Sequence, residues 1–225
     1  MRSLPPLPYG SLPHTIPLLA LTLGMALMLS ACALPGGRSP ETRYYVMTLP
    51  AEAAPQLTAR LVTGPHVAVG PVSVPGYLER RQIFVRRDNA TDINLSKYDH
   101  WGESMSDGIT RLLVESLSAR LAPSGGMALP LRSGNACDWR VSVEVVRFDG
   151  APGHEVVLDA GWTLSTPAGA SIREGHFVSR VSAQPGVDGL VRAHGVLLDR
   201  LGETVTAAVR ELPPPNFGAT SPKRR

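Results

Sequence analysis

Val156-Val157-Leu158-Asp159-Ala160-Gly161-Trp162-Thr163-Leu164 is the stretch that decides the fold class of this 225-residue chain. Every second residue from Val156 to Leu164 is apolar, and this period of two is typical of a strand with one buried face. Turn residues lie on both sides, at 150–153 and 166–169. With the alternating run 141–145 and the segment 172–183, the stretch predicts three consecutive antiparallel strands.

A long amphipathic segment follows these strands. From 188 to 211, apolar residues recur at spacings of three and four, which predicts a helix, and Asp188 is placed to cap its start. A similar segment from Trp101 to Leu121 predicts another helix, ended by Pro123 and the glycines after it. His194 falls on the apolar stripe of the later helix, where we expect a hydrogen-bonded core histidine rather than a metal ligand.

Four further segments, 43–49, 66–74, 83–87 and 91–95, predict strands in the first half of the chain. Within 66–74 the apolar alternation changes parity at Gly70-Pro71, which predicts a β-bulge or a strand break, because Pro71 cannot donate to a ladder. Asp88-Asn89-Ala90 predicts the turn of a hairpin. The expected fold class is therefore α/β, a mixed sheet of about seven short strands with two amphipathic helices packed on it.

The N-terminus carries a different signal. Leu29-Ser30-Ala31-Cys32 ends an apolar run that starts at Ile16, and it matches the lipobox of a lipoprotein signal peptide. We expect cleavage after Ala31 and acylation of Cys32. The alternatives are an ordinary cleaved signal and an uncleaved anchor helix, although the run is shorter than the roughly 20 residues of a membrane span.

The predicted organisation follows from that cleavage site. Residues 1–31 form the signal peptide, 32–42 a lipidated N-terminus and tether, 43–212 a single domain, and 213–225 a disordered, Pro-rich and basic tail. In Gram-negative lipoproteins an Asp after the lipidated cysteine commonly marks inner-membrane retention. Ala33 and Leu34 stand there instead, which favours the periplasmic face of the outer membrane.

Charge and cysteine content argue against two classes of protein. The 22 Lys and Arg residues nearly balance 19 Asp and Glu residues, whereas a nucleic-acid partner would require a dense basic face. If Cys32 carries lipid, Cys137 has no partner within the chain, which excludes a disulfide-stapled fold. We expect Cys137 to be a small buried hydrophobe rather than a reactive thiol.

The sequence holds no recognisable catalytic or cofactor motif. It lacks the G-x-S-x-G, H-E-x-x-H, Walker and dinucleotide-binding patterns. The histidines of the mature chain lie in different predicted elements. The acidic residues between Asp88 and Asp107 lack calcium-loop spacing, so hairpin and helix-cap roles explain them better. We expect no enzyme activity, no metal and no cofactor.

Two motifs around the predicted hairpin resemble those of a known family. The first runs from Pro75 to Ile83 and the second from Tyr98 to Met105. They are similar to the ABC-type transport auxiliary lipoproteins, the family of PqiC and YmbA. The matching residues are Pro75, Tyr77, Leu78, Glu79, Arg80, Gln82, Ile83, Trp101 and Glu103. Arg81 departs from a frequent Pro and Met105 from a usual Leu.

The resemblance implies a non-enzymatic envelope lipoprotein that works beside an MCE-domain protein in lipid transport between the inner and outer membranes. It also implies docking as the mechanism, with a ring of identical subunits as one possible form of the assembly. A carrier that encloses an apolar ligand and a lipoprotein hydrolase are the alternative functions. The first requires a large apolar cavity, and the second a nucleophile and base that the sequence does not show.

The connection between the predicted strands is the candidate interface. Tyr77, Leu78, Arg80 and Arg81 follow Pro75-Gly76 and precede the hairpin, so we expect them to be exposed and to contact a neighbouring subunit or the MCE partner. The alternative is that Leu78 plugs the sheet edge and the arginines pair with Glu79 or Glu103. Pro75, Trp101 and Glu103 are expected to be structural, with Trp101 in the core.

Overall fold

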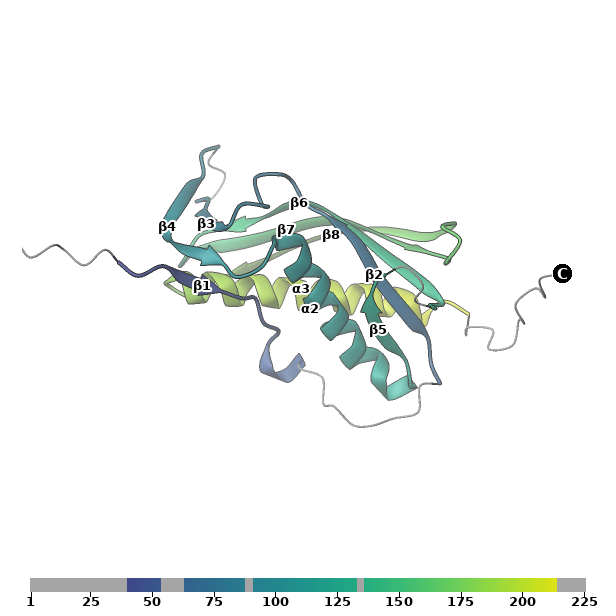
Figure 1. Cartoon of the computed structure of the whole chain (residues 1–225). Coiled ribbons are helices and arrows are strands. Elements are labelled where there is room, and N and C mark those ends of the chain that lie inside the picture. The colour runs from purple at the N-terminus through teal and green to yellow at the C-terminus, as the bar shows by residue number, and fades with distance from the viewer. Residues whose placement is uncertain (1–39, 54–62, 88–90, 133–135, 214–225) are drawn as a thin grey trace, which may run out of the picture. The chain divides into compact units, whose positions relative to one another are not determined.

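A computed structural model of the chain describes residues 40–53, 63–87, 91–132 and 136–213 (Figure 1). Contacts between residues divide the chain into two units, 1–40 and Glu41–Arg225. Every described residue of the hydrophobic core belongs to the second unit, which therefore carries a core of its own. Within the described ranges, no helix is long and apolar enough to cross a membrane. The predicted signal peptide and Cys32 lie outside the described residues.

The strands form two mixed sheets. The smaller has the order β1-β4-β3, from Arg43–Tyr45, Asn94–Trp101 and Gln82–Val85. The larger has the order β5-β2-β6-β7-β8, from Met127–Pro130, His66–Ser73, Trp139–Gly150, Glu155–Ser165 and Ser171–Ser182. The end of β3 lies beside the end of β6, where the N–H of Arg86 donates to the carbonyl oxygen of Gly150 at 3.0 Å. The prediction of a mixed α/β fold is confirmed, with eight described strands in two sheets where about seven were expected.

Most strand predictions agree with these sheets. β6, β7 and β8 are consecutive and antiparallel, as the alternation of 156–164 predicts. The register between β2 and β6 shifts between Val69 and Val72, which confirms the irregularity predicted at Gly70-Pro71. β3 and β4 pair antiparallel as the predicted hairpin, but β4 begins at Asn94 and continues to Trp101, well past the predicted segment 91–95. The turn of the hairpin lies outside the described residues. β5 was not predicted; it pairs parallel with β2.

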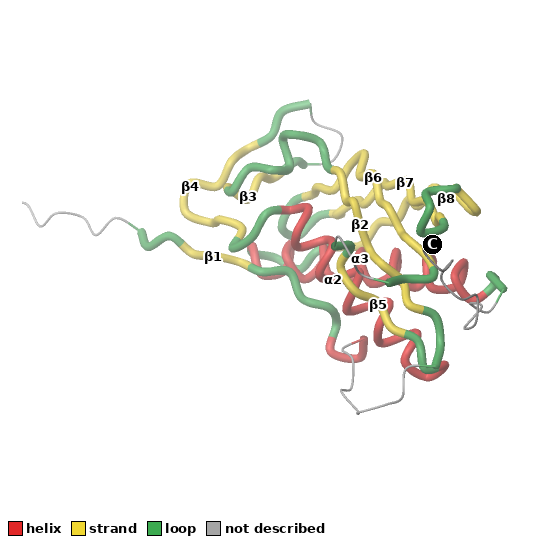
Figure 2. The backbone as a smooth tube through the Cα atoms, turned by 45° about the vertical axis from the view of Figure 1, so that its right-hand side comes forward, coloured by secondary structure: helices red, strands yellow, loops and turns green. Residues whose placement is uncertain are grey.

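The two helices, α2 (Met105–Leu121) and α3 (Val187–Arg210), form one layer against the larger sheet (Figures 1 and 2). α2 contacts β2 and β5, α3 contacts β7 and β8, and the helices contact each other. Their apolar stripes meet the inward side chains of the strands, and this interface is the hydrophobic core. An ion pair of 2.7 Å between Arg120 and Asp199 joins the helices at the edge of that core.

Two predictions about helix starts are wrong. α2 begins at Met105 rather than Trp101, because Ser104 caps it by accepting a hydrogen bond of 3.1 Å from the N–H of Asp107. Trp101 is instead the last residue of β4. The N-cap of α3 is Gly186, at a φ of 86° and without a side-chain hydrogen bond, so Asp188 lies in the first turn instead of capping it. The carboxylate of Asp188 still interacts favourably with the positive end of the helix dipole.

The chain after β1 is held tightly between the helices. Met47 is only 2% exposed, and its carbonyl oxygen accepts a hydrogen bond of 2.9 Å from Arg111 of α2. On the other side, a Cβ atom added at Gly195 of α3 would lie 1.9 Å from the carbonyl oxygen of Thr48. Any side chain at position 195 would therefore push this stretch away from α3, which explains a glycine in the middle of a helix.

Candidate functional site in the β2–β3 connection

The connection between β2 and β3 spans residues 74–81 and is a fixed turn. The N–H of Leu78 donates to the carbonyl oxygen of Pro75 at 2.8 Å, which closes the turn. The carbonyl oxygen of Arg81 accepts a hydrogen bond of 2.7 Å from the N–H of Trp101, which ties the end of the connection to β4. The segment is therefore attached to the smaller sheet by its backbone, with its side chains left to pack or to project.

Tyr77 anchors this connection to the larger sheet. Its hydroxyl donates to Oδ2 of Asp149 on β6 at 3.3 Å, and its half-buried ring meets Phe84 edge to face at 5.4 Å. The guanidinium of Arg86 lies 5.5 Å from the centre of the same ring. Burial, followed by the negative charge of Asp149, raises the pKa of Tyr77 above its usual value of 10.0. Tyr77 is thus a neutral hydrogen-bond donor that fixes the turn.

Asp149 is the residue at this site that the sequence did not reveal. Its side chain is fully buried, 0% exposed, and forms ion pairs with Nε of Arg147 at 2.7 Å and Nε of Arg86 at 3.3 Å. A buried carboxylate requires partners of this kind. The only signal in the sequence is an acidic residue at the end of an apolar strand, and nothing in it points to Tyr77, 72 residues away.

The other candidate interface residues separate into two groups. Leu78 is 0% exposed and belongs to the core, so the prediction of an exposed Leu78 is wrong. Its side chain points inward because the turn closed at Pro75 directs it under the connection. Arg80 and Arg81 are both exposed, beside an exposed Glu79. Glu103 does not pair with them; it accepts a hydrogen bond of 2.5 Å from Arg111 of α2.

Trp101 and His194 pack together in the core. Trp101 is 5% exposed, and the centres of its ring and the imidazole of His194 are 5.5 Å apart. The Nδ1 proton of His194 is donated to the carbonyl oxygen of Leu190 at 2.8 Å, which confirms the prediction of a hydrogen-bonded core histidine. Complete burial lowers the pKa of His194 below 6.5, because the charged imidazolium would lose its hydration.

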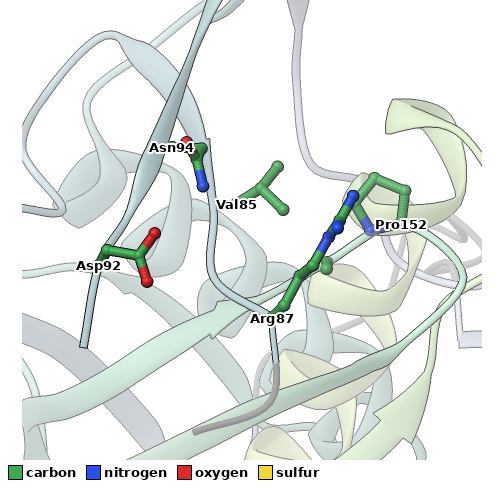
Figure 3. A pocket seen from close by; sticks show the side chains of 6 residues that line it. Val85, Arg87, Asp92, Asn94 and Pro152 are labelled. Atoms are coloured by element: carbon green, nitrogen blue, oxygen red, sulfur yellow. The ribbon is translucent and has the colours of Figure 1, made fainter. Parts of the chain in front are cut away.

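The described surface also has several open hollows. One of about 670 Å³ is bordered by Val85, Arg87, Asp92, Asn94, Ala151 and Pro152, and Figure 3 shows polar groups along its wall. Another of about 470 Å³ lies where α2 and α3 end, against Trp139. Neither has the enclosed apolar wall of a lipid carrier.

Cys137 is partly exposed, contrary to the expectation of burial. Within the described part of the chain, no three acidic, histidine or cysteine side chains gather as metal ligands.

Comparison of the sequence with models of known families identifies a family for this chain. The model of the family described as "ABC-type transport auxiliary lipoprotein component" matches residues 45–206. The chain belongs to this family. Its members are lipoproteins that assist an ABC-type transporter, so this is a class of transport components and not a class of enzymes, and membership implies a transporter as partner. No curated protein matches the sequence significantly.

Solved structures share the fold of this family member. An uncharacterized protein is similar with a TM-score of 0.57 at 18% identity, and the match covers 76% of this chain and 99% of the other. A Xanthomonas campestris protein of the DUF330 family is similar with a TM-score of 0.56 at 13% identity, with coverages of 75% and 94%. At these identities the likeness concerns the fold alone.

Proposed function

We propose that this transport auxiliary lipoprotein is anchored in the outer membrane through Cys32 and docks a periplasmic assembly of MCE-domain protein that moves lipid between the two membranes. Identical subunits side by side, as a ring, would present several docking sites to one assembly. Family membership supports the transport role, and the lipobox supports the anchor. The observation that most supports docking is the fixed β2–β3 connection with its exposed arginines.

The proposed anchor has a simple physical basis. Each acyl chain contributes about 0.8 kcal/mol per buried methylene, and stable anchoring requires more than one chain. A triacylated Cys32 meets that requirement. Changing Cys32→Ser removes the only atom that can take the diacylglyceryl group, so the protein should leave the outer-membrane fraction and lose the mass of its lipid. Lipidation would be disproved by a variant of unchanged mass that still sediments with outer membranes.

The connection suits docking because its backbone is fixed before any partner arrives. Tyr77 fastens it to Asp149, and the Arg81 carbonyl fastens it to β4, so little backbone conformational entropy is lost when Arg80 and Arg81 bind. Arginine is enriched at interfaces, where its fork of donors pairs with carboxylates and carbonyls of a partner. The buried Leu78 supports the turn from below and has no direct part in docking.

The test uses Arg80→Ala combined with Arg81→Ala. Both side chains are exposed, so the double variant should fold normally, whereas Tyr77→Ala would disturb the connection itself. Interface arginines of this type contribute about 2 kcal/mol or more, which corresponds to roughly a 30-fold weaker affinity. Arg192→Ala, an exposed arginine on α3, is the matched control and should leave binding unchanged.

Two measurements separate the possible outcomes. Full-length protein is purified from detergent-solubilised envelopes, and the MCE-domain protein bound to each variant is quantified by mass spectrometry. The mass of the oligomer is measured by light scattering on the unit Glu41–Arg225. Loss of partner with an unchanged oligomer places the arginines at the partner interface, and loss of the oligomer places them between subunits. If both properties survive in the double variant, the connection is not the docking surface.

A further inference from the structure

The smaller sheet has an outer face that no other described element covers. Tyr44 of β1 pairs with His100 of β4, and Tyr98 and Val46 continue the two rows on the same side, because side chains alternate along a strand. We call these four residues the outer aromatic face. The opposite side of the same strands faces the protein, where Asp99 and Trp101 are 8% and 5% exposed.

The side chains of this face are apolar or amphipathic; Tyr44 and Val46 are exposed, and Tyr98 and His100 are half-buried. Tyr44 is 65% exposed and Val46 is 49% exposed. The rings of Tyr44 and His100 meet edge to face with centres 5.9 Å apart, and Nζ of Lys97 lies 5.4 Å from the centre of the Tyr98 ring. Phe, Trp and Tyr make up only 5% of the chain, so two tyrosines on the same face of two paired strands are a local concentration of aromatic side chains.

The position of the face in the sequence identifies that partner. Ten residues, 33–42, lie between Cys32 and Arg43, the first residue of β1. Even fully extended, a chain of this length cannot exceed about 40 Å. If Cys32 is acylated as proposed, β1 is the described element that the shortest stretch of chain joins to the acyl chains. Tyrosine rings favour the interface between membrane and water, where the ring lies among headgroups and the hydroxyl stays hydrated.

We propose that the outer aromatic face rests on the headgroup region of the membrane in which Cys32 is anchored, and so sets the orientation of the domain. The inference rests on the anchor proposed above. The tether supplies a high local concentration, so a weak contact is enough to fix the orientation. Charge has a small part, since Arg43 is paired with Asp99 at 2.8 Å and the exposed Lys97 is offset by the exposed Glu41. The contact should therefore depend little on salt or on anionic lipid.

The experiment replaces the natural anchor with an artificial one. The unit Glu41–Arg225, with Cys137→Ser and a histidine tag before Glu41, is bound to vesicles of phosphatidylethanolamine and phosphatidylglycerol that contain a nickel-chelating lipid and a headgroup nitroxide. A fluorophore is attached at Val46→Cys. In the control it is attached at Val178→Cys on β8, a valine that is 53% exposed against 49% for Val46. At position 46 we expect at least about a twofold loss of emission, because interfacial contact brings the fluorophore within reach of the nitroxide.

A second variant tests the tyrosines directly. Tyr44→Ser with Tyr98→Ser should restore the emission at position 46 towards the value at position 178, in low and in high salt alike. Equal quenching at the two positions would overturn the proposal. The proposal would also be overturned if, without vesicles, the fluorophore at position 46 were shielded from solvent and the mass of the protein in solution were doubled, since a second copy would then cover the face. Neither result depends on the MCE partner, so this test can fail while the docking proposal stands.

Discussion

Replacing Asp149 tests whether the buried ion cluster holds the two sheets and the β2–β3 connection together. The carboxylate is 0% exposed, while the side chains of Arg86 and Arg147 are 23% and 26% exposed. Asp149→Asn keeps the shape but removes the charge that compensates both guanidinium groups. Breaking a buried pair in this way costs about 3–5 kcal/mol. Because water reaches the arginines, we expect the lower end, about 3 kcal/mol.

The assay is urea unfolding of the unit Glu41–Arg225 followed by circular dichroism. With a slope of about 2 kcal/mol per molar urea, a loss of 3 kcal/mol lowers the midpoint by about 1.5 M. Glu211→Gln is the matched control, because it breaks an ion pair with Arg173 in which the side chains are 42% and 63% exposed. Such a surface pair contributes under about 1 kcal/mol. If the two variants lose the same stability, the cluster does not hold the sheets together and the reasoning is refuted.

Two further predictions concern the core around Trp101. Trp101→Ala removes a ring that is 5% exposed, and thermal unfolding should show a loss of about 3–5 kcal/mol in stability. The control Tyr44→Ala, at a residue that is 65% exposed, should change stability by less than about 0.5 kcal/mol. Similar melting curves for the two variants would place Trp101 outside the core. Burial lowers the pKa of His194, so His194 takes up a proton at a higher pH in the unfolded chain than in the native one. The free energy of unfolding should therefore fall as the pH drops below about 6.5. The loss should be up to about 1.4 kcal/mol per pH unit until the pKa of His194 in the folded protein is reached. Urea unfolding at pH 7.5 and 5.5 should show this loss in the wild type and in His100→Asn but not in His194→Asn, and an equal loss in all three would contradict the assignment.

Periodicity predicted the elements that bury a face over many residues. The alternation of 156–164 and the helical stripe of 188–211 are long, and both gave the right element in the right place. β5 was missed because Met127–Pro130 has four residues, ends in proline and shows no alternation. It forms because β2 offers it a parallel ladder and Ser118 of α2 bonds to the backbone of Ala128. Neither β2 nor Ser118 lies within the short stretch of sequence from which a local pattern could have predicted this strand.

The candidate site was predicted in outline and not in its contacts. Proline and glycine at positions 75 and 76 correctly indicated a connection, because both favour turns. The burial of Leu78 and the ion pairs of Asp149 depend on how β6 lies against the turn, and this is decided by tertiary packing. Trp101 was assigned to the helix because its apolar side chain suits the helical stripe equally well. The cap at Ser104, three residues before Asp107, was the local signal that separates strand from helix.

The fastening of the chain after β1 has a mechanical consequence. If the domain is anchored and docked as proposed, any pull between the membrane and the docked assembly enters it at Arg43, the first residue of β1. β1 has only three residues paired with β4, too few to resist a sustained load alone. The force passes on to Met47, wedged in the core, to the hydrogen bond from Arg111, and to the close contact of Thr48 with Gly195. A pull on the proposed anchor would therefore load both helices at once, through Arg111 of α2 and Gly195 of α3.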